Sequence, residues 1–238
     1  MSDVGLAASS EQLAHAAELE RRDAVVGREL ETILDVARRA GTIRGRASEI
    51  SEALSGIPSS LAEIEVRRRE IEADAGRARS ELAAAEALVA ALETARRQKP
   101  DQLDRARSQS STAREQLADA EAQLDRLAAT EQELHGQQGS LRKEADALPR
   151  AAAAVAAEIR SLARVTEVAG AEPGMTLDDV EEWGARVRSA LFVARGTLET
   201  ERERIVVEAN ALGTAVLGES LGGSSVAVIR RRLEESVG

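Results

Sequence analysis

The sequence predicts an all-α protein, in which an elongated antiparallel coiled-coil hairpin, residues 61–134, projects from a helical bundle formed by the N- and C-terminal helices. The first reason is composition: among 238 residues there are one Phe, one Trp and no Tyr, whereas 31% are charged. Compact mixed α/β domains seldom lack large side chains to this degree, and the balance is typical of long helices. The second is a repeated three-and-four spacing of apolar residues, and the third is a proline between two such runs.

Residues 1–58 are predicted to form a long N-terminal helix from about Ser10. An apolar stripe runs along it at helical spacing: Val26, Leu30, Ile33, Ala37, Ile43, Ala47, Ile50 and Leu54. We expect this helix to end at Gly56-Ile57-Pro58. Ser60 and Glu63 match a capping box, which predicts that the next helix starts there.

Residues 59–135 are predicted to form an antiparallel coiled-coil arm with its turn at residues 98–101. One seam runs from Leu61 to Leu92 and a second of matching length from Leu103 to Leu134. Pro100 excludes the α conformation for the residue before it, and Asp101 is expected to cap the second limb. A short connection makes the limbs antiparallel, and roughly 35 residues per limb would reach about 50 Å.

Three seam positions carry polar residues, Arg68, Ser110 and Glu131. We interpret them as positions that solvent reaches in a narrow two-helix interface. The alternative is that they fix the register of the two limbs.

The remaining chain is predicted to contain a kinked helix, a linker and a C-terminal helical segment. Gly136, Gly139 and Pro149 predict kinks or a short break in the helix of residues 136–168. Residues 169–176 form the linker, after which Thr176 and Asp179 match a capping box. Residues 177–238 carry an apolar or small residue every seven positions from Leu177 to Leu212, then a Gly-rich loop, 213–225, and a final helix, 226–235.

Composition also limits the chemistry. Cysteine is absent, which excludes disulfides and thiolate zinc sites, and His15 and His135 lack ligand partners at helical-turn spacing. The segment from Gly213 to Ser220 resembles a phosphate-binding loop, but Glu219 stands where the phosphate-binding lysine belongs. We therefore expect no catalytic residues, no metal and no cofactor. No secretory signal or membrane span is visible, so the expected compartment is the cytoplasm.

Candidate partner contacts lie at the tip of the arm, where basic residues cluster around the turn: Arg96, Arg97, Lys99, Arg105 and Arg107. Such a cluster could bind phosphates. We favour a structural interpretation, in which cations complement the negative end of the first limb and nearby acids neutralise the patch.

The two large aromatic side chains, Trp183 and Phe192, are further candidates for partner contacts. Their spacing of nine residues places them on adjacent faces of one helix. We expect both to pack in the core, whereas an exposed ring would mark an interface.

These features predict a non-enzymatic structural or interaction protein that acts as a spacer or scaffold and contacts a protein partner or a second copy through helices. One alternative is a DNA-associated accessory, or arm, of a chromosome-maintenance (SMC-like) ATPase machine, but a net charge of -10 and a tip without aromatic residues disfavour nucleic acid. A second is a peripheral membrane-remodelling helical protein, although residues 1–20 have only a thin apolar face.

Overall fold

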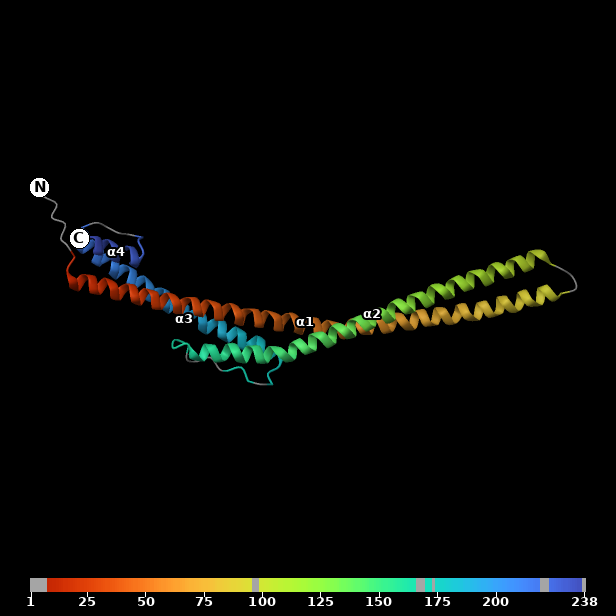
Figure 1. Ribbon diagram of the computed structural model, residues 1–238. Coiled ribbons are helices and arrows are strands. Elements are labelled where there is room, and N and C mark those ends of the chain that lie inside the picture. Colours follow the sequence, from red (N-terminus) through yellow and green to blue (C-terminus); the bar gives the residue numbers. More distant parts are fainter. Residues whose placement is uncertain (1–7, 96–98, 166–169, 173, 219–222, 237–238) are drawn as a thin grey trace. The chain divides into compact units, whose positions relative to one another are not determined.

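The computed structural model consists of four helices (Figure 1), and no strand occurs among the residues that it describes, 8–95, 99–165, 170–172, 174–218 and 223–236. The helices are α1 (Ser10–Thr94), α2 (Pro100–Ser161), α3 (Leu177–Leu217) and α4 (Val226–Glu235). The all-α prediction is confirmed. The chain divides into two compact units: unit 1 comprises residues 1–48 and 147–238, and unit 2 comprises residues 49–146.

Unit 2 is an antiparallel helical hairpin made of the second half of α1 and most of α2. Its seam buries mainly small side chains, which allow the two helices to approach closely. The buried seam residues are Ile71, Ala75, Ala78, Ala85, Ala106, Ser110, Ala113 and Ala120. All of them belong to the two predicted seams, so the predicted pairing of the limbs is confirmed.

The predicted end of the first helix at Gly56-Ile57-Pro58 is wrong, because α1 continues through Pro58 to Thr94. Ile57 is buried, whereas Pro58 is exposed. We attribute the continuity to packing of the flanking seam residues, which outweighs the helix-breaking tendency of proline. The predicted capping box is also absent: the Ser60 hydroxyl lies 3.5 Å from the carbonyl oxygen of Gly56, one turn back in the same helix.

The predicted break between α1 and α2 is confirmed, but its capping differs from the expectation. The carbonyl oxygen of Lys99 accepts hydrogen bonds from the amides of Gln102 and Leu103, both at 3.1 Å. Pro100 is therefore the first helical residue, a position where its missing N–H is harmless. Asp101 lies inside the first turn of α2 and is not the capping residue.

Two further boundaries differ from prediction. α2 is continuous from Pro100 to Ser161, so the short break expected around residues 136–149 is wrong. α3 extends to Leu217, so residues 213–217 are helical and not part of the predicted loop. Gly213 lies on the buried face of α3, and the helix ends at Gly218, whose φ of 70° is left-handed.

Unit 1 contains the start of α1, the end of α2, and α3 and α4. Its largest fully buried side chains come from α1, α2, α3 and α4: Leu19, Val36, Ile159, Trp183, Leu191, Leu198, Ile205, Ile229 and Leu233. The seven-residue pattern predicted the packed face of α3, because Gly184, Leu191, Leu198 and Ile205 are all buried. The capping box is confirmed as well, since the Asp179 amide donates to the Thr176 hydroxyl at 3.3 Å and the Thr176 amide donates to Asp179 at 2.8 Å.

Candidate interaction surfaces

Only three of the five basic residues predicted at the tip lie among the described residues. Arg96 and Arg97 lie outside the described residues. Lys99 and Arg105 are exposed, whereas Arg107 is paired with Glu93 of the opposite limb at 2.9 Å. Arg107 therefore already has a partner of opposite charge within the hairpin.

Arg107 belongs to a ladder of ion pairs along one edge of the hairpin. Arg79 pairs with Glu121 at 3.2 Å, Glu86 with Arg114 at 2.6 Å, and Glu93 with Arg107 at 2.9 Å. The pairs recur every seven residues, and the two residue numbers in each add to 200. This spacing is that of the positions flanking a heptad seam, so the ladder defines a single antiparallel register.

Two of the three polar seam residues meet across the hairpin. Arg68 forms an ion pair with Glu131 beside the seam, and both side chains are about one-third exposed. The first interpretation holds for this pair because solvent reaches it. The second also has support, because the two residue numbers add to 199, within one of the 200 found in the ladder. Ser110 is the third residue, and it is buried.

The opposite edge of the hairpin is different. A groove of about 440 Å³ runs along it, and Leu88 of α1 and Thr112 of α2 both line it. Leu88 is 45% exposed. The other residues that line the groove are uncharged apart from Glu81: Ala84, Ala85, Ser108, Gln109, Ala113 and Gln116. We call this surface the Leu88 groove.

The sequence reasoning did not identify the Leu88 groove. The heptad pattern of α1 did contain a signal for this groove, because the residues that flank the seam differ between its two sides. One side carries Arg79, Glu86 and Glu93. The other side carries Glu81, Leu88 and Ala95. One row is wholly charged and the other is not. That asymmetry marks the edge on which a neighbouring helix could pack.

The aromatic pair is split between the core and the surface. Trp183 is 1% exposed, which confirms the predicted core packing, and its indole Nε1 is buried without a hydrogen-bond partner among the described residues. Phe192 is 75% exposed, so the prediction that it packs in the core is wrong. The reason is its position on α3, one residue beyond the buried seven-residue row at Leu191.

Phe192 lies on an outer face of α3 that carries other exposed apolar side chains. Val193 is 65% and Val207 66% exposed. Gly196 and Thr200 lie between them at helical spacing and are also exposed. Large apolar side chains that gather on one solvent-facing helix surface are an interaction signal, whereas scattered ones are not.

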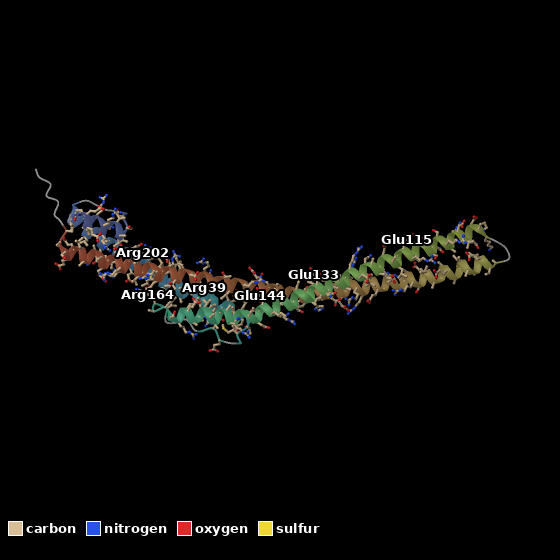
Figure 2. All side chains as sticks on the ribbon, viewed as in Figure 1. Arg39, Glu115, Glu133, Glu144, Arg164 and Arg202 are labelled. Carbon is tan, nitrogen blue, oxygen red and sulfur yellow. The ribbon has the colours of Figure 1, made fainter. Side chains whose placement is uncertain are left out.

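Several ion pairs connect different helices of unit 1. Arg39 pairs with Glu158, Arg164 with Glu29 and Glu201, and Arg202 with Asp23 (Figure 2). The hydrogen bond from Arg39 lowers the pKa of Glu158, against the opposing effect of burial. The Arg39 pair joins α1 to α2 and the Arg202 pair joins α1 to α3, whereas Arg164, just beyond the end of α2, contacts both α1 and α3.

The histidines are also in surface pairs. His15 Nε2 lies 3.1 Å from Glu208, and His135 Nε2 lies 3.9 Å from Glu131. Within the described ranges, no group of three or more His, Cys, Asp or Glu side chains could hold a metal ion. None of the described helices has both the length and the apolar character needed to cross a bilayer.

Comparison of the chain with protein-family models, with curated proteins and with solved structures finds no match. Function must therefore be argued from the surfaces above.

Proposed function

We propose that this chain is a non-enzymatic scaffold in which the hairpin is a spacer and partners are bound through helix faces. The observation that carries the proposal is the ladder of cross-limb ion pairs, repeated every seven residues beside a seam of small side chains. Such a hairpin has one register and encloses no chamber, so its geometry suits holding parts at a set separation.

The outer face of α3 supports the second half of the proposal. Phe192, Val193 and Val207 are large apolar side chains that remain mostly exposed to solvent on one helix. Exposed aromatic side chains are enriched where proteins bind one another, because a rigid ring buries a large area at a small cost in side-chain entropy.

A photo-reactive amino acid placed at Phe192 in the native host tests this proposal. We expect an adduct of one defined mass. The matched control carries the same group at Glu31, which is exposed on α1 and has no ion-pair partner among the described residues. Identical adducts from both positions, or none from either, would count against a scaffold that acts through α3.

A further inference from the structure

Charged residues lie at and beyond the two ends of the Leu88 groove, and the hairpin does not pair them. Glu81 and Asp119 line the adjoining groove together, so two acids lie close to each other at the end remote from the turn. Nearer the turn, Arg105 is exposed and precedes Thr112 by seven residues, so it lies two turns along the same row of α2. None of these three charged residues forms an ion pair within the described ranges, and the adjacent cation Arg77 is already paired with Asp74.

The middle of the same edge is uncharged. Leu88 and Thr112 stand at equal distances, seven residues, from the acidic end and from the level of Arg105. The opposite edge shows the contrast, because there Arg79, Glu86 and Glu93 each have a partner of opposite charge on the other limb. Toward the turn, this edge of the hairpin is therefore first acidic, then apolar and finally basic.

Two copies of this edge are complementary when they lie antiparallel, because the acidic end of each then meets the basic end of the other. If a second hairpin lies antiparallel across the groove with Leu88 on the two-fold axis, Leu88 meets the second Leu88. Arg105 of each copy then lies at the level of Glu81 and Asp119 of the other. Self-complementarity of this kind is what a two-fold interface requires.

We propose that the Leu88 groove binds the same groove of a second copy of this chain, so that two hairpins overlap antiparallel near their tips. The proposal rests on the scaffold function proposed above and names its partner at this surface. The overlap from residue 81 to residue 95 is short, about 20 Å at the rise of an α-helix. The association is accordingly weak and concentration-dependent, at the small end of specific interfaces.

Single-cysteine variants of the full chain test the two-fold axis, because the native sequence has no cysteine. L88C should oxidise rapidly to a covalent dimer, since the two side chains meet. V66C is the matched control: Val66 is 56% exposed on the same helix but lies outside the groove. Equal rates of dimer formation for the two variants would overturn the proposal.

Sedimentation over a range of protein concentrations tests the charges. R105E should weaken dimerisation about fivefold or more, since each dimer loses two ion pairs. The triple variant R105E/E81R/D119R should restore it, whereas R142E, an exposed cation of α2 far from the groove, should have no effect.

Far-UV circular dichroism of each variant verifies that helicity is retained. A chain that stays monomeric at every concentration, or a dimer that F192E dissociates and R105E does not, would overturn the proposal. Neither result would decide the scaffold function, which is judged separately by the adduct at Phe192.

Discussion

Replacing Gly184 by alanine should destabilise unit 1, although the same replacement usually stabilises a helix. A Cβ atom at Gly184 would lie 2.6 Å from Cβ of Arg44, 3.1 Å from its Cγ and 3.2 Å from its Cδ. The nearest of these atoms is attached directly to the α1 backbone, so rotation of the arginine side chain cannot relieve the contact. The two helices must move apart.

The expected size follows from two opposing effects. Alanine in place of glycine inside a helix stabilises by about 0.5–1 kcal/mol. Overpacking a close contact destabilises by about 1–3 kcal/mol. Gly196 on the same helix is the control, because its added Cβ meets nothing within 4 Å. We therefore expect G184A to be less stable than G196A by about 1–3 kcal/mol.

Urea denaturation followed by far-UV circular dichroism measures this difference. The midpoint should fall for G184A and rise for G196A, with unchanged slopes. The double variant G184A/R44G removes the clashing Cβ and should be more stable than the sum of its single changes. If G184A and G196A stabilise equally, α1 and α3 do not approach each other at this point.

Three other results are expected. P58A should stabilise the chain by up to about 3 kcal/mol in the same denaturation assay, because Pro58 is exposed inside a continuous helix; a destabilised variant would indicate that proline ends the helix after all. Hydrogen bonds from the backbone and then the side chain of Thr176 lower the pKa of Asp179. The stability that they contribute is present above the unfolded-state pKa of about 4 and is lost as the pH falls through the lower folded-state pKa. Thermal melts should accordingly show a smaller loss of stability on acidification for D179N, and identical pH profiles would contradict the capping box. W183A should lose about 3–5 kcal/mol and F192A less than about 0.5 kcal/mol, measured by denaturation; similar losses would contradict the separation of the two rings between core and surface.

The hairpin could be predicted from the sequence because its apolar residues repeat at a regular helical spacing. The seams ending at Leu92 and Leu134 repeat a spacing that only one helix face satisfies, and Pro100 gives the reversal. The ends of helices were harder to predict where a local signal conflicted with packing. Pro58 is a strong local signal for a helix end, but the burial of Ile57 and its neighbours outweighed it.

The interaction surfaces were less predictable than the helices. Phe192 and Trp183 look alike in sequence, and only the rotation of α3 about its axis separates the exposed ring from the buried one. The register of the hairpin also had to be known before Glu81 and Asp119 could be placed in one groove. Pair relations across two limbs depend on that register, which a seam of similar alanines specifies only weakly.

The most direct test of the account is whether the two limbs pair within one chain and in the register of the ion-pair ladder. Spin labels at E86C and R114C, measured by dipolar electron resonance, should give one short, narrow distance distribution. Dilution with an excess of unlabelled protein should leave it unchanged. An off-register pair, E86C with D125C, is displaced by eleven residues and should give a clearly longer distance. Loss of the short distance on dilution, or equal distances for the two pairs, would contradict the intrachain hairpin.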